Sequence, residues 1–97
     1  MALVRVYQAD IMAPNKFMNY DFSMKHGGIE RKYYKTVFSG ELPVRDLEAV
    51  FLLLNTDRPE GYVGHSLSVS DVVEFEGTTY FVDSFGFVPI YNFNKII

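Results

Sequence analysis

The segment from Gly64 to Asp71 gathers the residue types that hydrolases use. It reads Gly-His-Ser-Leu-Ser-Val-Ser-Asp, so that a histidine precedes three serines and an aspartate ends the run. Serine, histidine and a carboxylate are the nucleophile, the general base and the orienting group of a catalytic triad. Adjacent residues of an extended chain point to alternate faces, however, and the Gly-x-Ser-x-Gly elbow is absent. We therefore predict that the serines cap a turn or a short helix, and that Asp71 accepts hydrogen bonds from backbone N–H groups.

The two histidines, His26 and His65, are the candidate imidazole ligands of a metal ion. Their candidate carboxylate partners are Asp10, Asp21, Asp71 and Asp83. Neither a His-x3-His pair nor a His-x-Glu pair is present, so the spacing does not favour a metal site. A metal-dependent hydrolase or nuclease would need the fold to bring His26 and His65 together. We expect no metal, no other cofactor and no enzymatic activity.

Aromatic side chains are abundant, with 9 Phe and 7 Tyr in 97 residues. One small core does not need all of them, so some are expected at the surface. Tyr33, Tyr34, Phe85 and Tyr91 are the rings that we expect to be exposed. Exposed rings form either a protein-binding hot spot or a platform on which single-stranded nucleic acid stacks. Phe85 belongs to an Asp-Ser-Phe-Gly segment, in which Asp83 and Ser84 can bond to their own backbone and Gly86 can adopt a positive φ.

The charge of the chain favours a protein partner over nucleic acid. The net charge is −3 and the pI is about 5.2, whereas duplex DNA binding requires clustered Lys and Arg to neutralise phosphates. The one basic cluster, which lies between Lys25 and Lys35, is diluted by Glu30. Stacking on single strands would also need a positive groove. An acidic surface can instead cover the basic groove of another protein.

Alternating and β-branched residues predict strands at Leu3 to Gln8, Tyr33 to Phe38, Val72 to Phe75, Thr78 to Val82 and Phe87 to Phe93. Ser39-Gly40 is expected to end the second strand, and Glu76-Gly77 predicts a tight hairpin. Leu47, Val50, Phe51 and Leu54 form one apolar stripe, which predicts a helix that starts near Asp46 and ends at Asn55 to Pro59. The segment from Lys16 to Met24 fits either period. We predict one α+β domain over residues 1–97, an antiparallel sheet of about four or five strands with one main helix packed on one face.

The same sequence favours a cytoplasmic protein. Cysteine is absent, which suits a reducing compartment. Arg5, Gln8 and Asp10 interrupt any signal-peptide core. The densest apolar run, Val50 to Leu54, is too short to span a bilayer, so no membrane association is expected.

Tyr62 to Phe87 resembles the YodL-like domain, a small module found in Gram-positive bacteria and their mobile elements. The resemblance rests on the Ser-Leu-Ser run that ends at Asp71, the Glu76-Gly77 turn and the aromatic return from Tyr80 to Phe87. It is looser at Leu3 to Tyr7 and at the helix from Leu47 to Asn55. The family pattern often has a basic residue before the Ser-Leu-Ser run, where this chain has His65.

Small acidic domains from mobile elements often block host defence nucleases, so the resemblance implies an inhibitor of the anti-CRISPR or antirestriction type. Its partner would be a Cas9-like effector, and the mechanism would be steric, with an acidic face docked on the channel that loads DNA. The expected charges are Asp57, Glu60, Glu74, Glu76 and Asp83, and the expected anchors are Phe85 and Tyr91.

The resemblance also implies a second function, because the family's namesake is associated with the bacterial actin-like cytoskeleton. On that alternative the protein would modulate cell shape. Pairing of the last strand, near Pro89, with a second copy would give a homodimer, so both a monomer and a homodimer are open.

Overall fold

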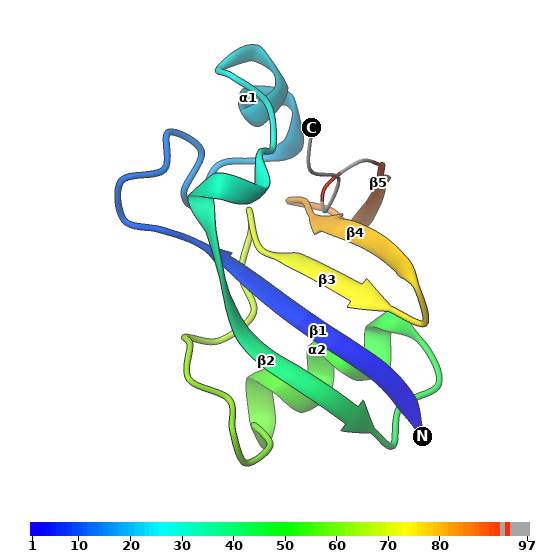
Figure 1. The fold of residues 1–97 in the computed structure, drawn as a ribbon. Helices are drawn as coiled ribbons and strands as arrows, with labels where there is room; N and C mark the ends of the chain where they lie inside the picture. Colours follow the sequence, from blue (N-terminus) through cyan, green and yellow to red (C-terminus); the bar gives the residue numbers. More distant parts are fainter. Residues whose placement is uncertain (92, 94–97) are drawn as a thin grey trace.

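The computed structural model describes residues 1–91 and 93. The elements, in chain order, are β1 (Ala2–Ala9), α1 (Tyr20–Lys25), β2 (Tyr34–Leu42), α2 (Leu47–Thr56), β3 (Val72–Phe75), β4 (Thr78–Val82) and β5 (Phe87–Ile90), with a short 3-10 turn at Arg31–Tyr33. The five strands form one sheet in the order β2-β1-β3-β4-β5, and every pairing is antiparallel (Figure 1). This confirms the predicted α+β class and the sheet with one main helix.

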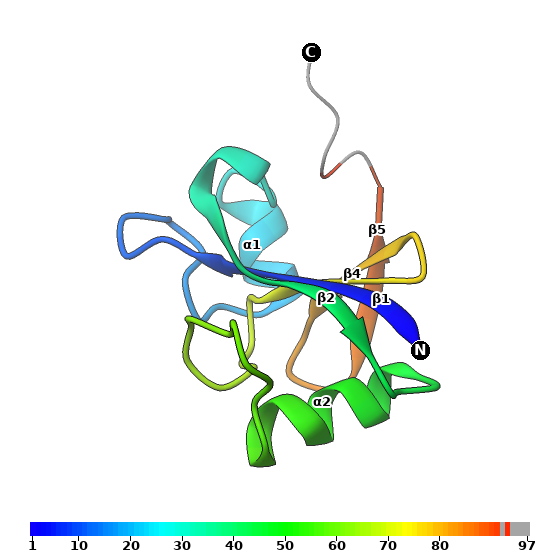
Figure 2. The ribbon, with the colours of Figure 1, turned by 60° about the horizontal axis from the view of Figure 1, so that its bottom comes forward.

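Both faces of the sheet are covered. Figure 2 shows α2 on one side of the sheet and α1 on the other. The core on the α2 side contains Val4, Val6, Val73 and Val82 from the strands and Val50 and Leu54 from the helix. The core on the α1 side contains Tyr7, Tyr34, Val72, Phe81 and Phe93. Neighbouring strand residues such as Phe81 and Val82 therefore serve opposite cores, as the two-residue repeat of a strand requires.

Helix α2 begins and ends as the sequence predicts. The side chain of Asp46 accepts a hydrogen bond from the Ala49 N–H at 2.8 Å, which satisfies one of the first free donors of the helix. Val50 and Leu54 are fully buried against the sheet. Phe51 belongs to the same apolar stripe but remains 41 % exposed, because it lies at the margin of the covered area.

Two predicted strand boundaries are wrong. Strand β2 continues through Ser39 and Gly40 to Leu42, since it pairs with β1 over its whole length, up to Ala2 opposite Leu42. A Cβ on Gly40 would lie 3.1 Å from the Phe38 ring, so the missing side chain lets that ring lie over the strand. The last strand ends at Ile90 rather than at Phe93, which instead packs in the α1-side core; residue 92 lies outside the described residues.

The segment from Lys16 to Met24, which fits either period, contains the short helix α1. Asn19 caps this helix by accepting a hydrogen bond from the Phe22 N–H at 2.9 Å. The predicted two-residue hairpin is confirmed, because Phe75 pairs with Thr78 and both Glu76 and Gly77 have positive φ.

Candidate protein-binding site

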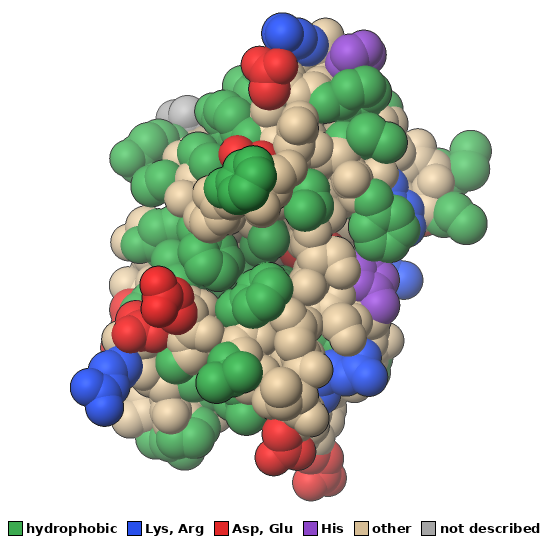
Figure 3. Space-filling model, turned by 180° about the vertical axis from the view of Figure 1, so that it is seen from behind, with side chains coloured by type: hydrophobic (Ala, Val, Ile, Leu, Met, Phe, Trp, Pro, Cys, Tyr) green, Lys and Arg blue, Asp and Glu red, His purple; other side chains and the backbone are tan. Residues whose placement is uncertain are grey.

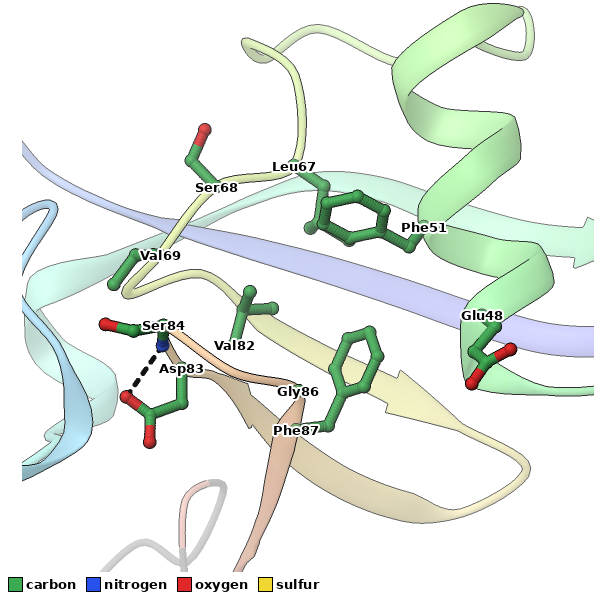
Figure 4. A pocket seen from close by; sticks show the side chains of 10 residues that line it. All are labelled: Glu48, Phe51, Leu67, Ser68, Val69, Val82, Asp83, Ser84, Gly86 and Phe87. Atoms are coloured by element: carbon green, nitrogen blue, oxygen red, sulfur yellow. Dashed lines mark hydrogen bonds between the residues drawn. The ribbon is translucent and has the colours of Figure 1, made fainter.

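An apolar groove of about 550 Å³ opens beside α2. Leu67 and Val82 lie at its base, and the rings of Phe51 and Phe87 line it in an edge-to-face contact with centroids 6.4 Å apart. Figure 4 shows these side chains converging from the helix, from the 67–69 segment and from the strands on either side of the β4–β5 turn. We call the space lined by Glu48, Phe51, Leu67, Ser68, Val69, Val82, Asp83, Ser84, Gly86 and Phe87 the α2 groove.

The groove lies on a face that is rich in exposed apolar side chains. Figure 3 views the molecule from behind the sheet of Figure 1 and shows hydrophobic side chains gathered over the middle of this face. Leu52, the neighbour of Phe51 on α2, is 64 % exposed. Contiguous apolar surface of this kind marks sites of association in soluble proteins.

The β4–β5 turn holds one aromatic ring in solvent at the edge of the groove. The Asp83 N–H donates to the Gly86 carbonyl at 3.0 Å, and Gly86 adopts a φ of 87° that favours glycine. The Asp83 carboxylate accepts from the N–H of Ser84 at 2.9 Å and from that of Tyr20 at 3.0 Å, which ties the turn to the start of α1. Phe85 is 98 % exposed at the tip of this braced turn. The sequence prediction for this turn is thus confirmed.

The rim of the groove is acidic. Glu48 and Asp83 line it, and a neighbouring hollow that shares Glu48 and Phe87 adds Asp46. Neither hollow is lined by a Lys or Arg from the described part of the chain. Glu48 lies in the first turn of α2, at the end of the helix where acidic side chains are favourable.

The run from His65 to Asp71 builds a polar network under the neighbouring loop. The Gln8 amide, which is 1 % exposed, donates to the Asp71 carboxylate at 3.0 Å and to the His65 carbonyl at 2.9 Å, and it accepts from the His65 N–H at 3.1 Å. Asp71 also accepts from the Ser68 N–H at 2.8 Å. The predicted structural role of Asp71 is therefore confirmed.

Burial dominates the electrostatics of this network. Asp71 is 1 % exposed, and its desolvation raises the pKa of the carboxyl to about 7, against the opposing effect of the hydrogen bonds from Ser68 and Gln8. Desolvation likewise raises the pKa of the Tyr62 hydroxyl to about 12. The hydroxyl of Tyr62 donates to the His65 carbonyl at 2.7 Å. These contacts fix the loop to β1.

His65 is not oriented as a triad base. Its Nδ1 lies 2.7 Å from the Ser66 carbonyl oxygen and 3.2 Å from the Gln8 amide nitrogen, so it faces groups other than the Asp71 carboxylate or a serine hydroxyl. Its Nε2 is buried without a hydrogen-bond partner, and the ring lies against Phe17. His26 instead stacks on Phe22 in α1. Among residues 1–91 and 93, no group of three or more His, Cys, Asp or Glu side chains could hold a metal ion.

The predicted binding residues fall on several surfaces. Asp83 and Phe85 belong to the groove and its edge. Asp57 and Glu60 are exposed just after α2, and Glu76 is exposed in the β3–β4 turn. Tyr91 is 82 % exposed but lines a different hollow, with Tyr20, Met24 and Ile29 on the α1 side.

Two predicted side chains lie elsewhere than expected. Glu74 lies on the α1-side face of β3, where its carboxylate accepts from the Arg5 guanidinium at 2.6 Å, so it faces away from the α2 groove. Tyr34 is 5 % exposed rather than at the surface. Its hydroxyl accepts from the Asn15 amide and donates to the Ser70 carbonyl, which gives the buried oxygen both partners.

Sequence reasoning missed the groove because its walls come from distant segments. The apolar stripe predicts Phe51 as a core residue, and the signals at Leu67 and Phe87 concern the Ser-Leu-Ser run and the last strand rather than a shared groove. The sequence pattern places Gln8 at the end of a strand and as a polar break in the N-terminal apolar run, and neither role predicts burial. A buried amide in that position is visible only once the loop from Gly64 to Asp71 is placed against β1.

These features define an α+β domain with an apolar groove and a braced aromatic turn. The family model for the YodL-like domain matches residues 3–93, and the chain therefore belongs to the YodL-like domain family. The match extends beyond the segment that carried the resemblance. No curated protein and no solved structure matches the chain. Within the described residues, no helix has the length and apolar character that crossing a membrane requires.

Proposed function

We propose that this domain is a non-enzymatic protein-binding module and that the α2 groove, with Phe85 at its edge, is its docking surface. The observation that carries the proposal is the pairing of an apolar groove of about 550 Å³ with a ring that is 98 % exposed on a braced turn. Aromatic anchors next to well-formed pockets supply much of the free energy of protein association. A rigid turn also lowers the entropy lost on binding.

The chemistry of the groove supports binding rather than turnover. Its polar groups are two hydroxyls, from Ser68 and Ser84, and two carboxylates, from Glu48 and Asp83. One Asp83 oxygen already accepts two backbone N–H groups. A general base needs hydrogen-bond reach to a nucleophile, and the imidazole of His65 is instead engaged with backbone and amide groups.

The partner that we propose is a nucleic-acid-processing defence complex such as Cas9. Membership of the YodL-like family and the net charge of −3 support this choice, because an acidic domain is drawn towards a basic DNA channel. The domain would then prevent DNA loading by occupying space. A modulator of the actin-like cytoskeleton is the second candidate, and family membership is the observation that favours it.

The first experiment titrates the protein into guide-loaded Cas9 that cleaves a target duplex, with a gel shift to follow DNA loading. We expect inhibition at near-stoichiometric amounts, with free DNA on the gel and intact guide RNA. Normal cleavage at a large excess would exclude Cas9 as the partner. Expression in bacterial cells, with cell width as the readout, then tests the cytoskeletal candidate.

A further inference from the structure

We infer that the α2 groove recognises a partner segment in which an apolar side chain is followed closely by Lys or Arg. This inference rests on the proposed function and specifies the chemistry of the partner. It follows from two properties of the groove, its apolar base and its acidic rim, which lie within one continuous surface.

The apolar base of the groove determines the first half of the recognition element, which is the apolar side chain. Leu67 and Val82 are each 3 % exposed, so they are already packed and form a firm floor. Phe51 and Phe87 stand at 78° to each other above them, in an edge-to-face contact. Phe51 remains 41 % exposed, so part of its surface is available to a third apolar group. Figure 4 shows both rings directed towards this space. A volume of about 550 Å³ lies within the range of sites that enclose small ligands.

The acidic rim determines the second half of the recognition element, which is the Lys or Arg side chain. Two adjoining hollows share Glu48 and Phe87, and the acidic residues Asp46, Glu48 and Asp83 are among those that line them. The Asp83 carboxylate is directed to the start of α1, where it accepts from the Tyr20 N–H, so the free charge at the rim comes from Glu48 and Asp46. Asp46 and Asp83 each use one oxygen to accept backbone N–H groups, which holds those carboxylates in place. Arg45 precedes the helix but lines neither hollow. Within residues 1–91 and 93, Glu48 forms no ion pair.

This arrangement selects a cation beside the apolar anchor. An acidic partner segment would meet the carboxylates of Glu48 and Asp46 at the rim, whereas a Lys or Arg would find a partner in Glu48 without leaving solvent. Charge pairs at such rims affect specificity and association rate more than they add to affinity. The apolar contact therefore provides most of the binding free energy, and the rim decides which sequence is accepted.

The test uses three capped dipeptides, acetyl-Phe-Arg-amide, acetyl-Phe-Gln-amide and acetyl-Phe-Glu-amide, each titrated into the ¹⁵N-labelled full chain. We expect backbone shifts around Phe51, Leu67 and Phe87, with the Arg peptide about fivefold tighter than the Gln peptide at low salt and the Glu peptide weakest. Glu48→Gln should remove the preference for Arg over Gln. Glu41→Gln, an exposed glutamate on β2, is the matched control and should leave it unchanged.

The outcomes separate the two proposals. Equal affinities for the three peptides at groove residues would overturn the charge preference but leave the groove as an apolar docking surface. Tighter binding of the Glu peptide would overturn the preference in the same way. Shifts confined to surfaces away from the groove, or no shifts at millimolar peptide, would overturn both the preference and the groove as the docking surface.

Discussion

At the scale of single residues, Asp71 lies in an environment that is costly for a charge. Its carboxyl is buried, and its pKa is raised from an ordinary 3.8 to about 7. The folded protein therefore holds a proton at pH 5 that the unfolded chain has released. Protonation favours folding, so this group stabilises the protein fully below pH 3.8, and the stabilisation is lost as the pH rises through 7.

The free energy of unfolding should accordingly fall by about 2 to 3 kcal/mol between pH 5 and pH 8 through Asp71 alone. Asp71→Asn keeps the acceptor oxygen for Gln8 and Ser68 and cannot ionise, so its stability should vary much less over this range. Urea unfolding followed by circular dichroism at several pH values measures both proteins. Every other ionisable group is the same in both proteins, so the difference between the curves isolates Asp71. Parallel curves would contradict the raised pKa.

The absence of a side chain at Gly64 is a second requirement at the residue scale, and its reason is steric. A Cβ there would overlap the Gln8 amide oxygen and lie 2.9 Å from a Val37 methyl group. Gly64→Ala should therefore displace Gln8 from its bonds and lower the free energy of unfolding by about 2 to 3 kcal/mol.

The control for Gly64 is Gly40→Ala, whose Cβ would lie 3.1 Å from the edge of the Phe38 ring and away from polar groups. We expect a smaller loss for this variant, measured by the urea midpoint. Equal losses would show that the Gln8 network adds little to stability.

At the scale of elements, the β3–β4 hairpin has the geometry of a two-residue turn, but Glu76 is not the residue that this turn position prefers. Both central residues have positive φ, 50° at Glu76 and 85° at Gly77, as a type I′ turn requires. Glycine adopts this conformation without strain, whereas glutamate does so at a cost. Asn-Gly is the preferred pair for such turns.

Glu76→Asn should therefore raise the free energy of unfolding by about 0.5 to 1 kcal/mol, with a thermal midpoint several degrees higher. Glu60→Asn, at an exposed position in the loop after α2, is the control and should change little. Calorimetry of the three proteins is the measurement. A lower midpoint for Glu76→Asn would mean that the glutamate side chain contributes contacts that outweigh the strain.

Elements with a clear period could be predicted from sequence, and elements decided by long-range pairing could not. The stripe on α2 and the two-residue hairpin carry local signals. The end of β2 does not, because Gly40 reads as a break until its pairing opposite Val4 is known. The exposure of Phe85 followed from its turn, whereas the burial of Tyr34 depended on partners such as Asn15 and Ser70.

At the scale of the whole molecule, the two faces of the sheet offer two different surfaces. Phe85 marks the edge of the α2 groove, whereas Tyr91 lines a hollow on the α1 side. The sequence predicted both rings as anchors of one interface. It could not assign them to faces, because that assignment depends on the path of the chain through β5.

The pair Phe85→Ala and Tyr91→Ala tests which surface docks. Both side chains are largely exposed, at 98 % and 82 %, so neither change should lower stability much. If the α2 groove docks, Phe85→Ala should weaken inhibition of guide-loaded Cas9 by tenfold or more, and Tyr91→Ala should leave it within about twofold. The loss should lie in the dissociation rate, because an apolar anchor acts after encounter.

Added salt should change the association rate constant rather than the dissociation rate constant. If the partner is a basic DNA channel, it attracts the acidic chain over long range, so rising ionic strength should slow association of the wild type and of Phe85→Ala by similar factors. Surface plasmon resonance at several salt concentrations separates the two rates. A large loss for Tyr91→Ala with none for Phe85→Ala would move the interface to the α1 side. If the association rate did not depend on salt, charge attraction would not contribute to binding, and the apolar groove alone would account for recognition.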